Sequence, residues 1–104
     1  MAKRTKVGVD ERIPIELTLE QRDLILNHTF AGPDLTGPLE VAPLTGTKIV
    51  VGYTLSAIDE LMGFVAAEAN HSADRKLRRK LDELYGYLQT FEDQYEDELS
   101  APRP

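Results

Sequence analysis

The sequence contains no cysteine, no tryptophan and only two histidines. The absence of cysteine excludes disulfide bonds, thiolate catalysis, cysteine-based zinc sites and iron–sulfur clusters. It is also typical of proteins from a reducing compartment. Four tyrosines and three phenylalanines are the only aromatic residues. The core must therefore be built mainly from Leu, Ile, Val and Ala.

Long apolar runs are absent as well. The longest purely aliphatic runs, such as Ile49-Val50-Val51, are far shorter than the roughly 20 residues of a membrane-spanning helix. The basic start at residues 3–6 is not followed by an apolar stretch of signal-peptide length. We therefore predict a cytoplasmic protein with no membrane contact.

The composition is that of one folded domain. The chain has 104 residues, of which 41% are hydrophobic and 29% are charged, and these fractions are typical of folded rather than disordered chains. A chain of this length buries roughly two thirds of its unfolded surface. We expect a flexible N-terminal tail over residues 1–11, a single compact domain over 12–99 and a flexible C-terminal tail over 100–104.

A strand is predicted over residues 12–17. Ile13, Ile15 and Leu17 alternate with Pro14 and Glu16, which is the period of a strand with one buried face. Pro14 cannot donate a hydrogen bond to a neighbouring strand, so we expect this strand at the edge of its sheet.

A helix over residues 19–29 is expected to follow. Thr18 is its predicted N-cap, and Gln21 stands where a capping box requires Glu or Gln. The side chains expected to be buried on this helix are Leu19, Ile25 and Leu26.

Residues 31–47 are rich in glycine and proline, which predicts turns and loop. A short strand over 39–41 is expected to pair with a β-branched strand over 48–54. Long loops in small domains are often functional, so the segment is either a recognition loop or an ordinary connection.

The last third of the chain predicts a helix hairpin. One helix is expected from Leu55, capped by Thr54 or Ser56, and a long helix over 74–99 follows after a short turn. The long helix has apolar residues at alternating spacings of four and three, which is a heptad seam. These seam residues are Leu77, Leu81, Leu84, Leu88, Phe91 and Tyr95. The predicted fold is α+β and mostly helical: a two- or three-stranded antiparallel sheet with three helices, the last two forming an antiparallel hairpin.

Charge is segregated along the long helix. Residues 75–80 are basic except for Leu77, and residues 92–98 are mainly acidic. A helix is stabilised by the opposite arrangement, because its N-terminus is partially positive. Two copies paired antiparallel around Gly86-Tyr87 would bring unlike blocks together, although a solvated charged face is the simpler alternative. The predicted interaction residues are Arg75, Arg78, Arg79, Gly86, Tyr87, Leu88, Phe91, Glu92, Tyr95 and Glu96.

Two other functions compete with self-association. Residues Arg75–Lys80 form a basic run that is typical of a nucleic-acid contact, although the net charge of −6 argues against a general nucleic-acid binder. Glu68 and His71 share a helix face at the spacing of some metal ligands. A complete metal site needs further ligands, so no cofactor is predicted.

Catalytic signatures are absent. The sequence has no Gly-x-Ser-x-Gly motif and no phosphate-binding glycine loop. We therefore predict a non-enzymatic interaction or regulatory module of a bacterial type that self-associates through its long C-terminal helix. Its expected partner is a second copy of the chain, in a homodimer, or another protein.

Overall fold

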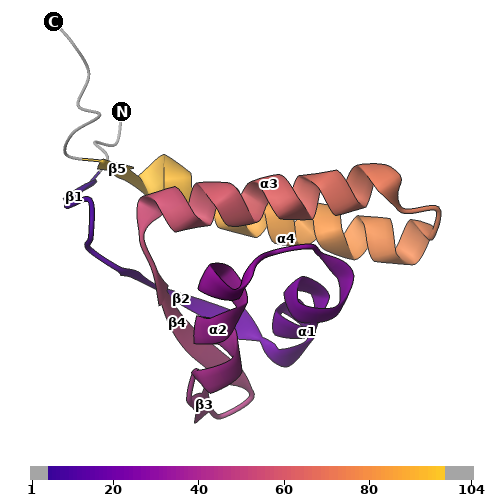
Figure 1. Ribbon diagram of the computed structural model, residues 1–104, viewed down its shortest axis with the longest axis horizontal. Helices are drawn as coiled ribbons and strands as arrows, with labels where there is room; N and C mark the ends of the chain where they lie inside the picture. Colours follow the sequence, from indigo (N-terminus) through magenta and orange to yellow (C-terminus); the bar gives the residue numbers. More distant parts are fainter. Residues whose placement is uncertain (1–4, 98–104) are drawn as a thin grey trace, which may run out of the picture.

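The computed structural model describes residues 5–97 and shows an α+β fold (Figure 1). The helices of this part of the chain are α1 (Leu19–His28), α2 (Pro33–Val41), α3 (Leu55–His71) and α4 (Arg75–Gln94). Its strands are β1 (Thr5–Val7), β2 (Ile13–Thr18), β3 (Leu44–Thr45), β4 (Lys48–Tyr53) and β5 (Tyr95–Asp97). The predicted α+β class, antiparallel sheet and final helix hairpin are confirmed.

The larger sheet has the strand order β2–β4–β3 and is antiparallel. Ile15 of β2 lies opposite Val51 of β4, and both side chains are buried. Their sequence neighbours point to the other face and are exposed or half-exposed, as the two-residue period requires. β2 is an edge strand, as predicted, so Pro14 removes no hydrogen bond from the ladder.

Three helices contact the sheet: α1 packs against β2, and α2 and α3 pack against β4, while α4 lies alongside α3 as the second helix of the hairpin (Figure 1). Each hairpin helix buries one apolar stripe. The buried residues are Ile58, Leu61, Met62, Val65 and Ala69 of α3 and Leu81, Leu84 and Leu88 of α4. Thr54 caps α3 by accepting a hydrogen bond from the backbone N–H of Ala57, and Thr18 and Gln21 form the predicted capping box of α1.

The loop predicted over residues 31–47 is wrong in its first half, where the structure has helix α2. Pro33 stands at the start of this helix, where its missing N–H and fixed φ are favourable. Leu35 and Leu39, one turn apart, are both buried, and the Tyr53 hydroxyl donates a hydrogen bond to the Leu35 carbonyl. Burial therefore overrides the low helix propensity of the segment. The short strand that pairs with β4 is Leu44–Thr45 and not the predicted 39–41.

The two ends of the described chain meet in a second, parallel pair of strands. Residues 5–7, assigned to a flexible tail from the sequence, form β1 and pair with β5. Val7 is 2% exposed and belongs to the core. The long helix ends at Gln94 rather than 99, because the chain becomes extended at Tyr95 to join β1. The predicted segments 98–99 and 100–104 lie outside the described residues.

One side chain of α1 was misassigned from the sequence. Leu19 is 37% exposed, whereas Leu24, which was not expected inside, is 6% exposed. Ile25 is buried as predicted, and Leu26 packs partly buried against the core. Leu19 is the first residue of α1, directly after the cap, so its side chain lies at the rim of the core rather than over it.

Candidate functional site

Four of the predicted interaction residues pack against the core, three of them on α4 and the fourth, Tyr95, at the start of β5. Leu88 is fully buried, and Tyr87, Phe91 and Tyr95 pack partly buried against the same core. The Tyr87 and Phe91 rings meet edge to face at 5.3 Å. These side chains contribute to the packing of the core. Leu88 has no exposed surface, whereas the other three keep part of their surface in solvent.

Tyr87 also forms a hydrogen bond between α4 and the sheet. Its hydroxyl donates a 2.5 Å hydrogen bond to the Glu16 carbonyl oxygen, on the edge strand β2. Partial burial raises the pKa of the Tyr87 hydroxyl above its usual value, and the negative charge of Glu16 raises it further. Both effects favour the protonated form, which is the form that donates this bond.

The outward face of α4 carries two of the other predicted residues, Arg79 and Gly86, together with Asp93, which was not predicted. Successive residues of a helix are about 100° apart, so Arg79, Gly86 and Asp93 lie on the side opposite the buried stripe. The structure places all three in solvent. We call these residues, with Asp82 and Thr90 between them, the outward stripe of α4.

Gly86 has no explanation within the chain. A Cβ atom added there would meet no atom within 4 Å, and its φ is not positive. A glycine in a helix interior destabilises the helix by about 1 kcal/mol relative to alanine. Neither backbone geometry nor intrachain packing therefore requires glycine at the centre of the outward stripe.

Charges of opposite sign flank this glycine symmetrically. Arg79 lies seven residues before Gly86, and Asp93 lies seven residues after it. At a rise of about 1.5 Å per residue, each charge is about 10 Å from the glycine along the helix axis. The Asp93 carboxylate accepts a 3.2 Å hydrogen bond from the Gln89 side chain, one turn earlier.

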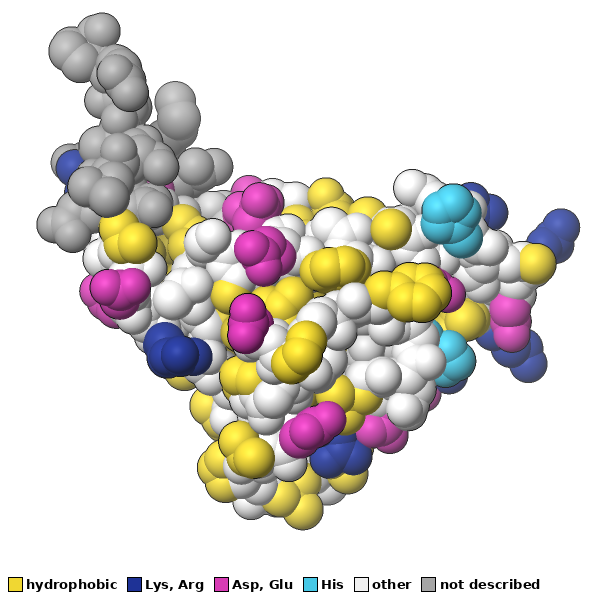
Figure 2. Space-filling view, viewed as in Figure 1, with side chains coloured by type: hydrophobic (Ala, Val, Ile, Leu, Met, Phe, Trp, Pro, Cys, Tyr) yellow, Lys and Arg dark blue, Asp and Glu magenta, His cyan; other side chains and the backbone are white. Residues whose placement is uncertain are grey.

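The charge order along α4 opposes the helix dipole. Its first turn has no acidic residue and its last turn has no basic residue. The cap, Asp74, accepts hydrogen bonds from the backbone N–H groups of Lys76 and Leu77. Figure 2 shows Lys and Arg side chains protruding at the right-hand end of the molecule, where Figure 1 places the α3–α4 turn.

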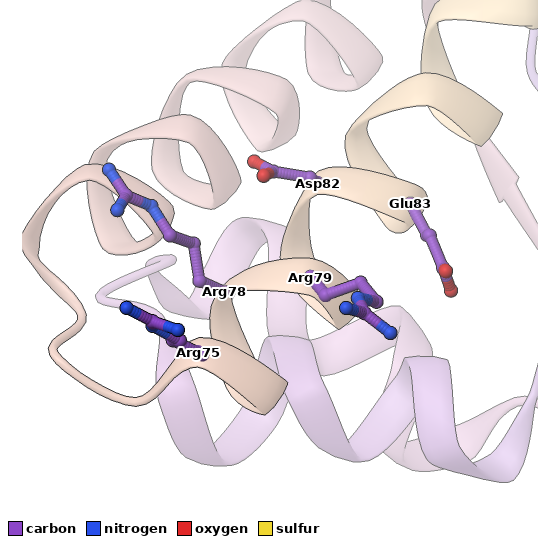
Figure 3. A pocket seen from close by; sticks show the side chains of 5 residues that line it. All are labelled: Arg75, Arg78, Arg79, Asp82 and Glu83. Atoms are coloured by element: carbon purple, nitrogen blue, oxygen red, sulfur yellow. The ribbon is translucent and has the colours of Figure 1, made fainter.

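The basic residues of α4 differ in how they are paired. Lys80 forms a 2.9 Å ion pair with Glu20 of α1. Within residues 5–97, Arg75, Arg78 and Arg79 form no ion pair. They line a shallow hollow with Asp82 and Glu83, in which Arg78 and Asp82 point to one side of the helix and Arg79 and Glu83 to the other (Figure 3).

The remaining predicted residues lie near the end of α4. Glu92 and Glu96 are both half-buried. Glu92 is on the helix, whereas Glu96 is in β5 and pairs in register with Lys6 of β1. The acidic block predicted for one helix is therefore divided between a helix and a strand.

The pair proposed from sequence as metal ligands stays incomplete. Glu68 is half-buried and His71 is exposed, both in the last turn of α3. Among residues 5–97, no three His, Asp or Glu side chains are grouped closely enough to hold a metal ion. The structure thus adds no third ligand from this part of the chain.

Several apolar side chains that were not among the predicted residues are exposed. Phe30 is 88% exposed, Val41 81% and Leu44 61%. Leu44 belongs to β3, and Val41 ends α2. No sequence signal marks them, because an apolar residue in a glycine- and proline-rich segment is as compatible with burial as with exposure.

No protein-family model, no curated protein and no solved structure matches this chain. Within the described residues, no helix is long and apolar enough to cross a membrane. The assignment of function therefore depends on the geometry of the chain itself.

Proposed function

We propose that this protein is a small non-enzymatic interaction module that forms a two-fold symmetric dimer through the outward stripe of α4. One observation carries the proposal: Arg79 and Asp93 are equidistant from Gly86 on the same exposed helix face. A two-fold axis at Gly86 reverses the direction of the second helix. It therefore sets Arg79 of each copy against Asp93 of the other.

The glycine determines how closely the two helices approach. Packed helix axes are about 8 to 10 Å apart, and the smallest side chains allow the shortest distances. Gly86 presents only backbone at the crossing point. Its helix-destabilising effect is then offset by contact with the second copy, which accounts for a residue that has no role in the monomer.

This interface differs from the one expected from sequence. The apolar seam is used inside the monomer, so Tyr87, Leu88, Phe91 and Tyr95 are not part of it. The axis lies at Gly86 rather than between Gly86 and Tyr87. The proposal retains the predicted cytoplasmic location and involves no cofactor.

The affinity of the proposed dimer should depend on salt concentration, because its contacts are exposed ion pairs. An exposed ion pair contributes only about 0.2 to 1 kcal/mol, and the symmetric dimer contains two copies of the Arg79–Asp93 contact. Salt at about 0.1 M screens exposed charges beyond about 10 Å. We therefore expect a weak, reversible dimer that forms best at low ionic strength.

Charge reversal tests this arrangement. In sedimentation equilibrium at 50 mM salt, Arg79→Glu and Asp93→Arg should each weaken dimerisation at least about tenfold, because each variant creates two like-charged contacts. The double variant Arg79→Glu/Asp93→Arg restores opposite charges and should recover most of the affinity. A matched control for Arg79→Glu is Arg12→Glu, which makes the same charge change directly before β2 and should leave dimerisation unchanged.

Two results would contradict the proposal. One is a wild-type protein that stays monomeric at several hundred micromolar and 50 mM salt. The other is a double variant that dimerises no better than the single variants, since recovery requires the two residues to face each other. Circular dichroism of each variant establishes that the fold is retained.

A further inference from the structure

The α3–α4 turn presents three basic side chains that the proposed dimer does not use. Arg75, Lys76 and Arg78 are all exposed and occupy the first turn of α4; we call them the basic tip. The molecule is elongated, with extents of 45 × 30 × 25 Å, and this turn lies at one end of its long direction (Figures 1 and 2).

The side chains of the basic tip have no carboxylate partners among the described residues. Elsewhere, Lys48 pairs with Glu16 at 3.4 Å, and Lys80 pairs with Glu20 at 2.9 Å. None of the three tip side chains has an ion pair within residues 5–97. The nearest acidic side chain in sequence, Asp74, is engaged by two backbone N–H groups as the helix cap.

These cations are also placed where they destabilise the helix. A positive charge near a helix N-terminus is unfavourable by roughly 0.3 to 1 kcal/mol, because the N-terminus is itself partially positive. The three charges repel one another as well. An anionic ligand would relieve both effects, so the arrangement is better suited to binding than to stability of the free monomer.

We propose that the basic tip contacts the phosphodiester backbone of nucleic acid. The planar guanidinium groups of Arg75 and Arg78 can each donate two parallel hydrogen bonds to one phosphate. Duplex DNA carries one charge per about 1.7 Å of helix axis, so even a tip of one helical turn meets several phosphates. A flexible acidic peptide would lose conformational entropy on binding to so small a surface.

The net charge of −6 does not cancel this local attraction. The screening length is about 10 Å at 0.1 M salt, whereas the molecule is 45 Å long. Acidic residues at the far end are therefore screened from a phosphate at the tip. Asp82 and Glu83 lie on the body side of the tip (Figure 3), which confines the contact to the outermost turn.

Fluorescence anisotropy with a labelled 20-base-pair DNA duplex tests the proposal on the full chain. The logarithm of affinity should fall linearly with the logarithm of salt concentration, with a slope of about −0.9 for each phosphate contacted. The variant Arg75→Gln/Arg78→Gln should bind at least about tenfold more weakly at 50 mM salt, with a slope reduced by about two. The control variant Arg12→Gln/Lys48→Gln removes the same amount of charge, from Lys48 of β4 and from Arg12 directly before β2, and should bind like wild type.

Three outcomes would overturn the assignment. They are no saturable binding at 500 μM protein and 50 mM salt, equal loss in the tip and control variants, and competition by polyglutamate as effective as that by unlabelled DNA. The last result would assign the tip to an acidic protein partner instead. The tip variant keeps Arg79, Gly86 and Asp93, so it should still dimerise; loss of DNA binding with intact dimerisation distinguishes this surface from the outward stripe.

Discussion

The inner and outer faces of α4 differ in burial and in their effect on the stability of the helix. The inner face buries Leu81, Leu84 and Leu88 at no more than 1% exposure each. The outer face carries Arg79, Gly86 and Asp93 in solvent, with a glycine that no intrachain contact requires. One face is optimised for folding, whereas the other contains features that weaken the isolated helix.

This contrast indicates where to look for interaction on a helix with an apolar seam. A seam of heptad spacing suggests a coiled coil with another chain, but here it is satisfied by α3 and the sheet within the monomer. The residues that lack an intrachain explanation lie about half a turn away. Self-association is therefore proposed from the outer face, on the positions of its charges around Gly86.

Substitution of an inner leucine should give the largest effect. Leu88 is fully buried, and truncation of a buried leucine to alanine typically removes about 2 to 5 kcal/mol of stability. We expect Leu88→Ala to lower the free energy of unfolding by that amount in urea denaturation. Glu83→Ala on the outer face should change it by less than about 0.5 kcal/mol. Equal effects would mean that Leu88 is not a core residue.

The two tyrosines on either side of Gly86 allow the same comparison of the inner and outer faces, with a smaller expected change in stability. Tyr87 donates its hydroxyl hydrogen to Glu16, whereas the Tyr85 hydroxyl has no hydrogen-bond partner within residues 5–97. Tyr87→Phe should therefore lower the free energy of unfolding by about 0.5 to 1.5 kcal/mol. Tyr85→Phe, the matched control, should leave it nearly unchanged. A larger effect for Tyr85 would contradict the assignment of the two faces.

The same tyrosine gives a pH dependence of known sign. The pKa of Tyr87 is raised in the folded protein, so the folded state holds its proton more tightly than the unfolded state does. This contribution to stability is complete below the usual tyrosine value of about 10 and is lost as the pH rises through and above it. In urea denaturation between pH 9 and 11, Tyr87→Phe should lose less stability than wild type. An identical decline in both proteins would exclude the effect.

The parts of the fold that were predicted correctly are those fixed by local patterns. The alternation in Ile13–Leu17, the capping box at Thr18 and the heptad leucines of α4 each determine an element without distant contacts. Helix α2 has a glycine- and proline-rich sequence and is held by burial of Leu35 and Leu39, which only the assembled core reveals. The β1–β5 pair joins opposite ends of the chain through three residues each, too few to show a period.

The candidate site was predictable only in part. The segregation of charge along α4 and the glycine at position 86 are visible in the sequence. The proposed surface contains Gly86 and a charged residue on each side of it. The apolar residues Tyr87, Leu88 and Phe91 were assigned to the same surface because the length of available intrachain cover was unknown. In the structure Leu88 is buried in the core, and Tyr87 and Phe91 pack partly buried against it. The seam identifies the buried side of α4, so the opposite side could have been derived from the sequence. That side includes Arg79, which was predicted, and Asp93, which was not.

Cross-linking at the proposed axis tests the central claim most directly. The chain has no cysteine, so a single introduced thiol reports on one position. A disulfide requires Cα atoms within about 7 Å, and a two-fold axis at Gly86 brings position 86 of both copies together. It separates the two copies of Thr90 by about 12 Å along the helices. Under mild oxidation at 50 mM salt, Gly86→Cys should form a covalent dimer much faster than Thr90→Cys. Cross-linking at Thr90 that equals or exceeds that at Gly86 would contradict the account.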